Sequence, residues 1–109
     1  MVDDCIFCKI IAGDIPSSKV YEDEEVLAFL DISQVTPGHT LVVPKKHARN
    51  LLEMDETATA QLFARVSKVA KKVEAATQAK GMNIISNMEE VSGQTVFHTH
   101  VHIIPRYSD

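Results

Sequence analysis

One long segment with helical periodicity lies among short segments typical of β-strands, and this combination restricts the fold more than any other feature of the chain. Between Asp55 and Lys80, apolar side chains recur at helical spacing and charged side chains occupy the opposite side. The apolar positions are Leu62, Phe63, Val66, Val69, Ala70 and Val73. Gly81 follows as a natural stop signal. The pattern predicts one long helix.

Segments typical of β-strands precede and follow this helix. Residues 19–31 read as two short strands joined by an acidic turn, and residues 39–44 form an apolar, β-branched strand. Two further strands are expected at residues 82–87 and 97–104, separated by a glycine-containing loop. Because strands dominate and a single long helix interrupts them, we expect an α+β fold with antiparallel strands rather than a parallel βαβ sheet.

A shorter helix is expected near the N-terminus. Asp4 is a good capping residue, and the segment from Cys5 to Ile11 that follows it is long enough for about two helical turns. Gly13 and then Pro16 mark the end of this helix.

Length and composition limit the architecture and the partners. A chain of 109 residues with 45% hydrophobic content supports one core but not two ordinary domains, so we expect residues 1–109 to form a single domain. The formal net charge is −4, and the basic residues are spread along the chain. Long nucleic acid normally binds to a basic patch, so it is not expected as a partner.

No part of the sequence predicts association with a membrane. The longest apolar stretches are far shorter than the roughly 18 residues that suggest a membrane span. The acidic start, Met1 to Asp4, does not resemble a signal peptide. We therefore expect a cytoplasmic protein without a membrane partner.

Three of the five histidines alternate with other residues at positions 98, 100 and 102. On a β-strand this spacing directs His98, His100 and His102 to one face and the residues between them to the other. Imidazole suits proton transfer, attack on phosphorus and metal ligation near neutral pH. Each buried imidazole also needs a polar partner, which a phosphate or a metal provides. The triad is therefore the main candidate for a functional site.

Cys5 and Cys8 have the two-residue spacing of a zinc-binding pair. A closed tetrahedral site needs two more ligands, for which His39, His47 and the triad are available. A redox pair is an alternative, although the surrounding sequence lacks the βαβ context of thioredoxin-like motifs. A second alternative is that both cysteines are small apolar residues of the core.

Other residues near the predicted strand ends are candidates for substrate binding. Asp31 ends a strand close to an aromatic residue and offers a carboxylate for paired sugar hydroxyls. Gln94 and Thr95, after Gly93, offer donors just before the triad, where an oxyanion would lie. Each of these features is also compatible with an ordinary turn or loop.

Taken together, these motifs resemble the histidine triad family of nucleotide hydrolases and transferases, whose motif is His-φ-His-φ-His-φ-φ with φ apolar. Here the motif reads His98-Thr99-His100-Val101-His102-Ile103-Ile104, with Thr99 as a mild departure. The similarity covers residues 5–16, 28–32, 38–47 and 103–107, and so nearly the whole chain. The sequence is most similar to the bacterial members that hydrolyse purine nucleoside phosphoramidates.

The resemblance implies five antiparallel strands with one long and one short helix, usually paired into a homodimer. It makes His100 the nucleophile that attacks the α-phosphate of a purine nucleotide and forms a covalent nucleotidyl-histidine. It places His39 and His102 beside the phosphate and Asp31 at the ribose. The other substrate contacts that it implies are Asn87, Gln94 and Thr95 at the phosphate, and Phe7, Ile10, Ile15, Phe29 and Ile32 in an apolar purine slot.

The resemblance also implies a structural zinc ion and no organic cofactor. In bacterial relatives with the two-cysteine opening, zinc is held at positions that match Cys5, Cys8, His47 and His98. Such a closed site leaves no open position for water and leaves His100 free to attack. The other ring nitrogen of His100 should then donate to a fixed acceptor such as a backbone carbonyl.

These expectations describe a zinc-stabilised hydrolase that cleaves purine nucleoside phosphoramidates, or other nucleoside monophosphates joined to a leaving group. Two rival interpretations are open at this point. In one, the triad itself holds a catalytic zinc ion. In the other, the protein is a nucleotide-binding or partner-binding module without turnover.

Overall fold

The computed structural model describes residues 4–108. These residues form one five-stranded antiparallel sheet and the helices that pack against it. The strand order is β1-β2-β3-β5-β4. In chain order the elements are α1 (Ile6–Ala12), β1 (Lys19–Glu22), β2 (Val26–Leu30), β3 (Thr40–Pro44), the 3-10 turn η1 (Leu51–Glu53), α2 (Glu56–Thr77), β4 (Gly81–Ile85), the 3-10 turn η2 (Glu90–Ser92) and β5 (Val101–Arg106). The expected fold class is confirmed.

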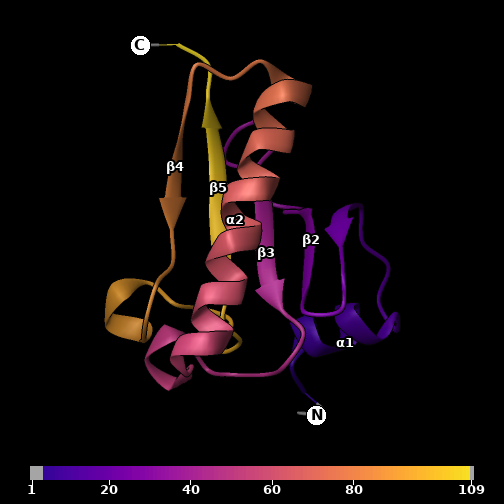
Figure 1. The fold of residues 1–109 in the computed structure, drawn as a ribbon, viewed down its shortest axis with the longest axis vertical. Helices are drawn as coiled ribbons and strands as arrows, with labels where there is room; N and C mark the ends of the chain where they lie inside the picture. The colour runs from indigo at the N-terminus through magenta and orange to yellow at the C-terminus, as the bar shows by residue number, and fades with distance from the viewer. Residues whose placement is uncertain (1–3, 109) are drawn as a thin grey trace.

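Helix α2 runs along one face of the sheet and forms a core with it (Figure 1). The helix begins after Asp55, whose carboxylate accepts from the N–H of Ala58 at 2.8 Å. The buried side of the helix consists of Leu62, Val66, Val69 and Val73, which pack against Val26, Ala28, Val42, Val101 and Ile103 of the sheet. Apolar residues that recur at helical spacing in the sequence therefore form the buried side of α2.

The other face of the sheet packs against α1. Side chains alternate along a strand, so Leu27 and Phe29 of β2 point away from α2 and join the second core. The other buried members of this core are Leu41 and Val43 of β3, with Cys5, Phe7, Cys8 and Ile10 from the N-terminal segment. In Figure 1, α1 lies at the end of the sheet where β3 ends.

The triad does not lie wholly on a strand, which corrects the expectation of a strand from Phe97. Strand β5 begins at Val101, so His102 is the one triad histidine within it. Before the strand, the N–H of Thr99 donates to the carbonyl of Ala48 at 2.8 Å, a bond to a loop rather than to a neighbouring strand. The side chains still alternate, because Val101 enters the α2 core whereas the first two triad rings contact α1.

The long helix ends earlier than the sequence predicts. It stops at Thr77 rather than near Lys80, because Gln78 takes a left-handed conformation with φ 59°. The N–H of Gln78 then donates to the carbonyl of Glu74 at 2.7 Å and closes the last turn. Gly81 is thus the first residue of β4 and not the helix stop.

The short helix also begins one residue later than expected. Its N-cap is Cys5 and not Asp4, and the Sγ of Cys5 accepts from the N–H of Cys8 at 3.3 Å. The helix ends at Gly13, which has φ 86° and so occupies the left-handed region that glycine tolerates. The N-cap bond from the N–H of Cys8 fixes the direction of the Cys5 sulfur.

No helix among residues 4–108 combines the length and apolar character that a membrane crossing requires.

Leu62 is fully buried between α2 and the sheet, with 0% of its surface exposed. Replacing it with alanine removes buried methyl groups and leaves a cavity, so we expect the free energy of unfolding to fall by about 2–5 kcal/mol. Urea denaturation measures this change. Lys71→Ala, on the exposed side of the same helix, is the control, with an expected change within about 0.5 kcal/mol. Equal losses in both variants would contradict the packing of α2 described above.

Candidate functional site

Four side chains from three distant parts of the chain meet where α1 approaches the ends of β3 and β5. The residues are Cys5, Cys8, His47 and His98, and their donor atoms all lie within 4.8 Å of one another. The Nδ1 atoms of His47 and His98 are 3.1 Å apart. The Sγ of Cys8 lies 3.4 Å from His47 Nδ1 and 3.5 Å from His98 Nδ1, and the Sγ of Cys5 lies 3.5 Å from His98 Nδ1.

The hydrogen bonds of His98 leave one nitrogen available to a metal. Its Nε2–H donates to the carbonyl of Pro44 at 2.8 Å, so Nδ1, which faces the sulfurs, carries the lone pair. Burial lowers the pKa of His98 to about 4, opposed by its bond to the Pro44 carbonyl, and the ring is therefore neutral near pH 7. Two sulfurs and two imidazole nitrogens form a donor set that suits zinc.

The spacing of these four donor atoms also fits a single ion. Zinc binds nitrogen at about 2.0–2.1 Å and sulfur at about 2.3 Å, so tetrahedral geometry separates its ligand atoms by roughly 3.3–3.8 Å. The four donor-atom separations of 3.1–3.5 Å lie close to that range. These residues therefore fit a closed tetrahedral metal centre.

His100 is oriented by the residue two positions before it. Its Nδ1–H donates to the carbonyl of His98 at 2.8 Å, so its lone pair is on Nε2. The ring packs edge-on against Phe7 and His102, with centroids 5.0 Å from each. Burial lowers the pKa of His100, and the bond to the His98 carbonyl opposes this effect. The Oγ of Ser86 donates to the carbonyl of His100 at 2.8 Å, a contact that sequence analysis does not predict.

A second group joins Asp31, His39 and His102, whose donor atoms also lie within 4.8 Å of one another. The Nε2 of His39 is 2.9 Å from His102 Nδ1 and 3.6 Å from a carboxylate oxygen of Asp31. Burial is the main cause that lowers the pKa of His39 and brings that of His102 to about 4. His39 lies diagonally across from His102, because it precedes β3 by one residue and is two residues before Leu41, which lies opposite His102 of β5.

The side chain of Gln94 is held by four hydrogen bonds within the protein. It is buried, with 2% of its surface exposed. Its Nε2 donates to the carbonyls of Arg49 and Val96 at 2.6 and 3.0 Å, and its Oε1 accepts from Asn50 Nδ2 and from the N–H of Glu89 at 3.1 and 2.8 Å. Both of its N–H donors are occupied, so in this structure the side chain holds the loop before the triad, and its contact with a phosphate stays a prediction.

The same loop is fastened by an ion pair that sequence reasoning missed. Arg49 donates to both carboxylate oxygens of Glu89, at 2.8 and 2.9 Å, and Asn50 donates to the same carboxylate at 2.8 Å. The Arg49 guanidinium also lies over the ring of Phe97, 4.3 Å from its centroid. Glu89 has φ 75°, and these bonds offset the strain of that conformation.

The remaining expected substrate contacts divide into accessible and buried residues. Thr95 is exposed and Asn87 is half-buried, in the loop that leads to the triad. Ile15 is half-buried, and Ile32 is 100% exposed. The other expected members of the apolar slot, Phe7, Ile10 and Phe29, are buried in the core around α1.

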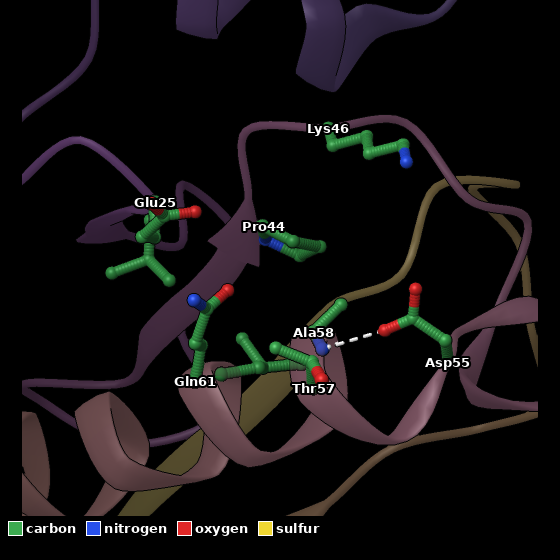
Figure 2. A pocket seen from close by; sticks show the side chains of 9 residues that line it. Glu25, Pro44, Lys46, Asp55, Thr57, Ala58 and Gln61 are labelled. Carbon is green, nitrogen blue, oxygen red and sulfur yellow. Dashed lines mark hydrogen bonds between the residues drawn. The ribbon is translucent and has the colours of Figure 1, made fainter.

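A separate hollow of about 200 Å³ lies between the end of β3 and the first turn of α2 (Figure 2). Its lining includes Pro44, Lys46 and Gln61. Figure 2 shows the Asp55 carboxylate already engaged by the N–H of Ala58, and none of the expected site residues lines this hollow. The hollow is therefore separate from the histidine clusters.

Comparison with known proteins assigns the family. The model of the HIT domain matches residues 12–109. A crystal structure from Streptococcus mutans has a TM-score of 0.97 and 65% sequence identity, over 100% of this chain and 69% of that one. "Protein hit" of Bacillus subtilis is 58% identical over 96% of this chain and 72% of its own length. The chain belongs to the HIT family.

A more distant relative has a named activity. The Arabidopsis thaliana protein "Adenylylsulfatase HINT3" is 39% identical over 95% of this chain. The matched region is 53% of the length of that relative.

Gln94→Ala removes the hydrogen bonds of a buried side chain to four partners at once. We expect the free energy of unfolding to fall by at least about 2 kcal/mol, because backbone groups and the Asn50 amide lose their partner. Urea denaturation measures the loss. The neighbouring variant Thr95→Ala changes an exposed side chain and should alter stability by less than about 0.5 kcal/mol. Unchanged stability in Gln94→Ala would show that these hydrogen bonds do not hold the loop before the triad.

Proposed function

We propose that the protein is a nucleotide hydrolase of the histidine triad type, with His100 as its nucleophile. The proposed substrate is a purine nucleoside monophosphate whose α-phosphate is joined to an amine or another leaving group. The orientation of His100 carries this proposal: the ring donates Nδ1–H to the carbonyl of His98 and keeps the Nε2 lone pair beside His102. Membership of the HIT family supports it, and so does the name of the relative called an adenylylsulfatase.

The proposed reaction has two steps. In the first, Nε2 of His100 attacks the α-phosphorus, the bond from phosphorus to the leaving nitrogen breaks, and that nitrogen takes up a proton. In the second, water attacks the same phosphorus, the bond to His100 breaks, and the water gives up a proton. The products are the nucleoside monophosphate and the amine, and His100 is again a neutral imidazole.

Other residues of the chain bind the substrate in this proposal. His102 lies next to the nucleophile and meets the charge that develops on the phosphoryl oxygens. Asp31, at the end of β2, accepts the ribose hydroxyls. The proposed phosphate loop contains Asn87 and Thr95, and the proposed purine slot consists of Ile15 and Ile32 above the buried side chains Phe7, Ile10 and Phe29.

We also propose that Cys5, Cys8, His47 and His98 hold a structural zinc ion, with no organic cofactor. Zinc bound there would cross-link α1 to the loop after β3 and to the segment before β5. Among residues 4–108, the triad does not converge on one ion: His98 belongs to this cluster, His102 to the Asp31 cluster, and His100 to neither. This division favours structural zinc over a catalytic zinc held by the triad.

The assembly and location follow the same proposal. We propose a single domain that pairs with a second copy, which is supported by the exposed apolar side chains Ile84 and Ile85 on the edge strand β4. Cys5 and Cys8 both belong to a metal-binding arrangement, which suits the reducing cytoplasm. The substrate is a small nucleotide, and neither long nucleic acid nor a membrane takes part.

His100→Ala should abolish turnover of a purine nucleoside phosphoramidate. The variant lacks the attacking nitrogen, so we expect release of the nucleoside monophosphate to slow by at least about 10⁴-fold. Rapid quenching in an alkaline denaturant, in which a phosphorus–nitrogen bond to histidine survives, followed by mass spectrometry should detect a nucleotidyl adduct on the wild-type protein and none on the variant. Matching thermal midpoints serve as the folding control. Full activity in His100→Ala contradicts the assignment, and tight nucleotide binding without turnover in the wild type would instead indicate a binding module.

Removal of zinc should reduce turnover by lowering the stability of the folded protein. Prolonged chelation should lower the thermal midpoint by at least about 5 °C, which corresponds to about 1 kcal/mol in a domain of this size. Turnover should then decline slowly, in step with the loss of folded protein. Cys8→Ser should reproduce the lower midpoint and reduce the zinc content found by elemental analysis. Immediate loss of turnover at an unchanged midpoint would favour the catalytic-zinc interpretation.

A further inference from the structure

The group formed by Asp31, His39 and His102 has the composition of a metal site, but its hydrogen bonds place a proton on a nitrogen that a metal would need. The backbone N–H of Val35 donates to Nδ1 of His39 at 3.1 Å. A backbone N–H is only a donor, so Nδ1 of His39 is an acceptor and carries no proton. His39 is 2% exposed, and burial lowers its pKa, so the ring is neutral and its single proton is on Nε2.

The loop that carries Val35 is itself fixed by hydrogen bonds. The N–H of Asp31 donates to the carbonyl of His39 at 2.9 Å, and the N–H of His39 donates to the carbonyl of Thr36 at 3.1 Å. The N–H of Ser33 donates to the Asp31 carboxylate at 2.8 Å. The donor on Val35 is therefore held in place by the same loop that ends at His39.

The proton of His39 determines the proton of His102. Nε2 of His39 lies 2.9 Å from Nδ1 of His102, so the N–H of His39 donates and Nδ1 of His102 accepts. We propose that His39 is a positioning residue that holds His102 as a neutral imidazole with its proton on Nε2, so that His102 meets the substrate as an N–H donor. The contact between His102 and the substrate rests on the proposed function. The positions of the protons rest only on the hydrogen bonds.

The charged groups around the pair agree with this assignment. The carboxylate of Asp31, 3.6 Å from Nε2 of His39, is a second acceptor for the same N–H and keeps the proton there. Arg106 acts on His39 from β5 and lowers its pKa, whereas Asp31 raises it. The groups that face His102 are His39, His100 and Asp31. A proton added at Nδ1 of His102 would confront the N–H of His39, so the imidazolium form is disfavoured.

The same reasoning separates this group from the metal centre. A histidine that binds metal through one nitrogen donates the other N–H to an acceptor, as His98 does toward the carbonyl of Pro44. To bind metal through Nε2, His39 would need its proton on Nδ1, where the N–H of Val35 already points. The hydrogen bonds of the Asp31 group therefore determine which nitrogens of His39 and His102 carry protons. In this proposal His39 acts on the phosphate through His102.

The first test needs no substrate and no substitution. The zinc-loaded protein, labelled with ¹⁵N at histidine, is studied by long-range ¹H–¹⁵N correlation at neutral pH. We expect His39 and His102 each to show a protonated Nε2 and an unprotonated Nδ1. A protonated Nδ1 on His102, alone or in an imidazolium, would overturn the proposal.

The second test uses two substitutions of nearly equal shape. His39→Gln retains an N–H donor for His102, whereas His39→Glu presents only acceptor oxygens. We expect His102 to keep its Nε2 proton in the Gln variant, and to move the proton to Nδ1 with a raised pKa in the Glu variant. At matched thermal midpoints, turnover should be at least about 10-fold slower with Glu than with Gln.

The outcomes separate this inference from the proposed function. Equal spectra and equal rates in the two variants would show that His39 does not set the proton of His102. If the wild-type protein releases no monophosphate from a phosphoramidate, the proposed function fails, whereas the spectra still decide the proton positions.

Discussion

Hydrogen bonds between backbone groups and imidazole rings are the constraint on which the site depends. The carbonyl of Pro44 accepts from His98, the carbonyl of His98 accepts from His100, and the N–H of Val35 donates to His39. A neutral imidazole has one proton and one lone pair, so each of these bonds decides which nitrogen is free. The backbone thereby gives three identical side chains three different chemical roles.

His98 connects the two halves of the site. Its ring belongs to the cluster of sulfurs and nitrogens, and its carbonyl orients the ring of His100. A metal bound to the ring would also restrain the backbone to which His100, the proposed nucleophile, is hydrogen-bonded. Phe7 of α1 packs against both rings, so the short helix supports this connection from the second core.

Much of the fold could be predicted from the sequence, because its periodicities are local. The helical spacing of Leu62 to Val73 is the buried side of α2, and the alternation around Val101 separates the two cores. The errors occur where a tertiary bond competes with a local preference. Thr99 bonds to Ala48, 51 residues earlier in the chain, and the strand predicted from Phe97 therefore begins only at Val101.

The sequence by itself determined the fold class, the family motif and the set of residues able to bind metal or attack phosphorus. Side-chain chemistry and spacing are sufficient for that. Only the tertiary structure decided how the histidines divide between two clusters, and which nitrogen of each carries the proton. These properties depend on donors and acceptors that every peptide unit possesses, and folding alone brings a particular backbone group to a particular ring.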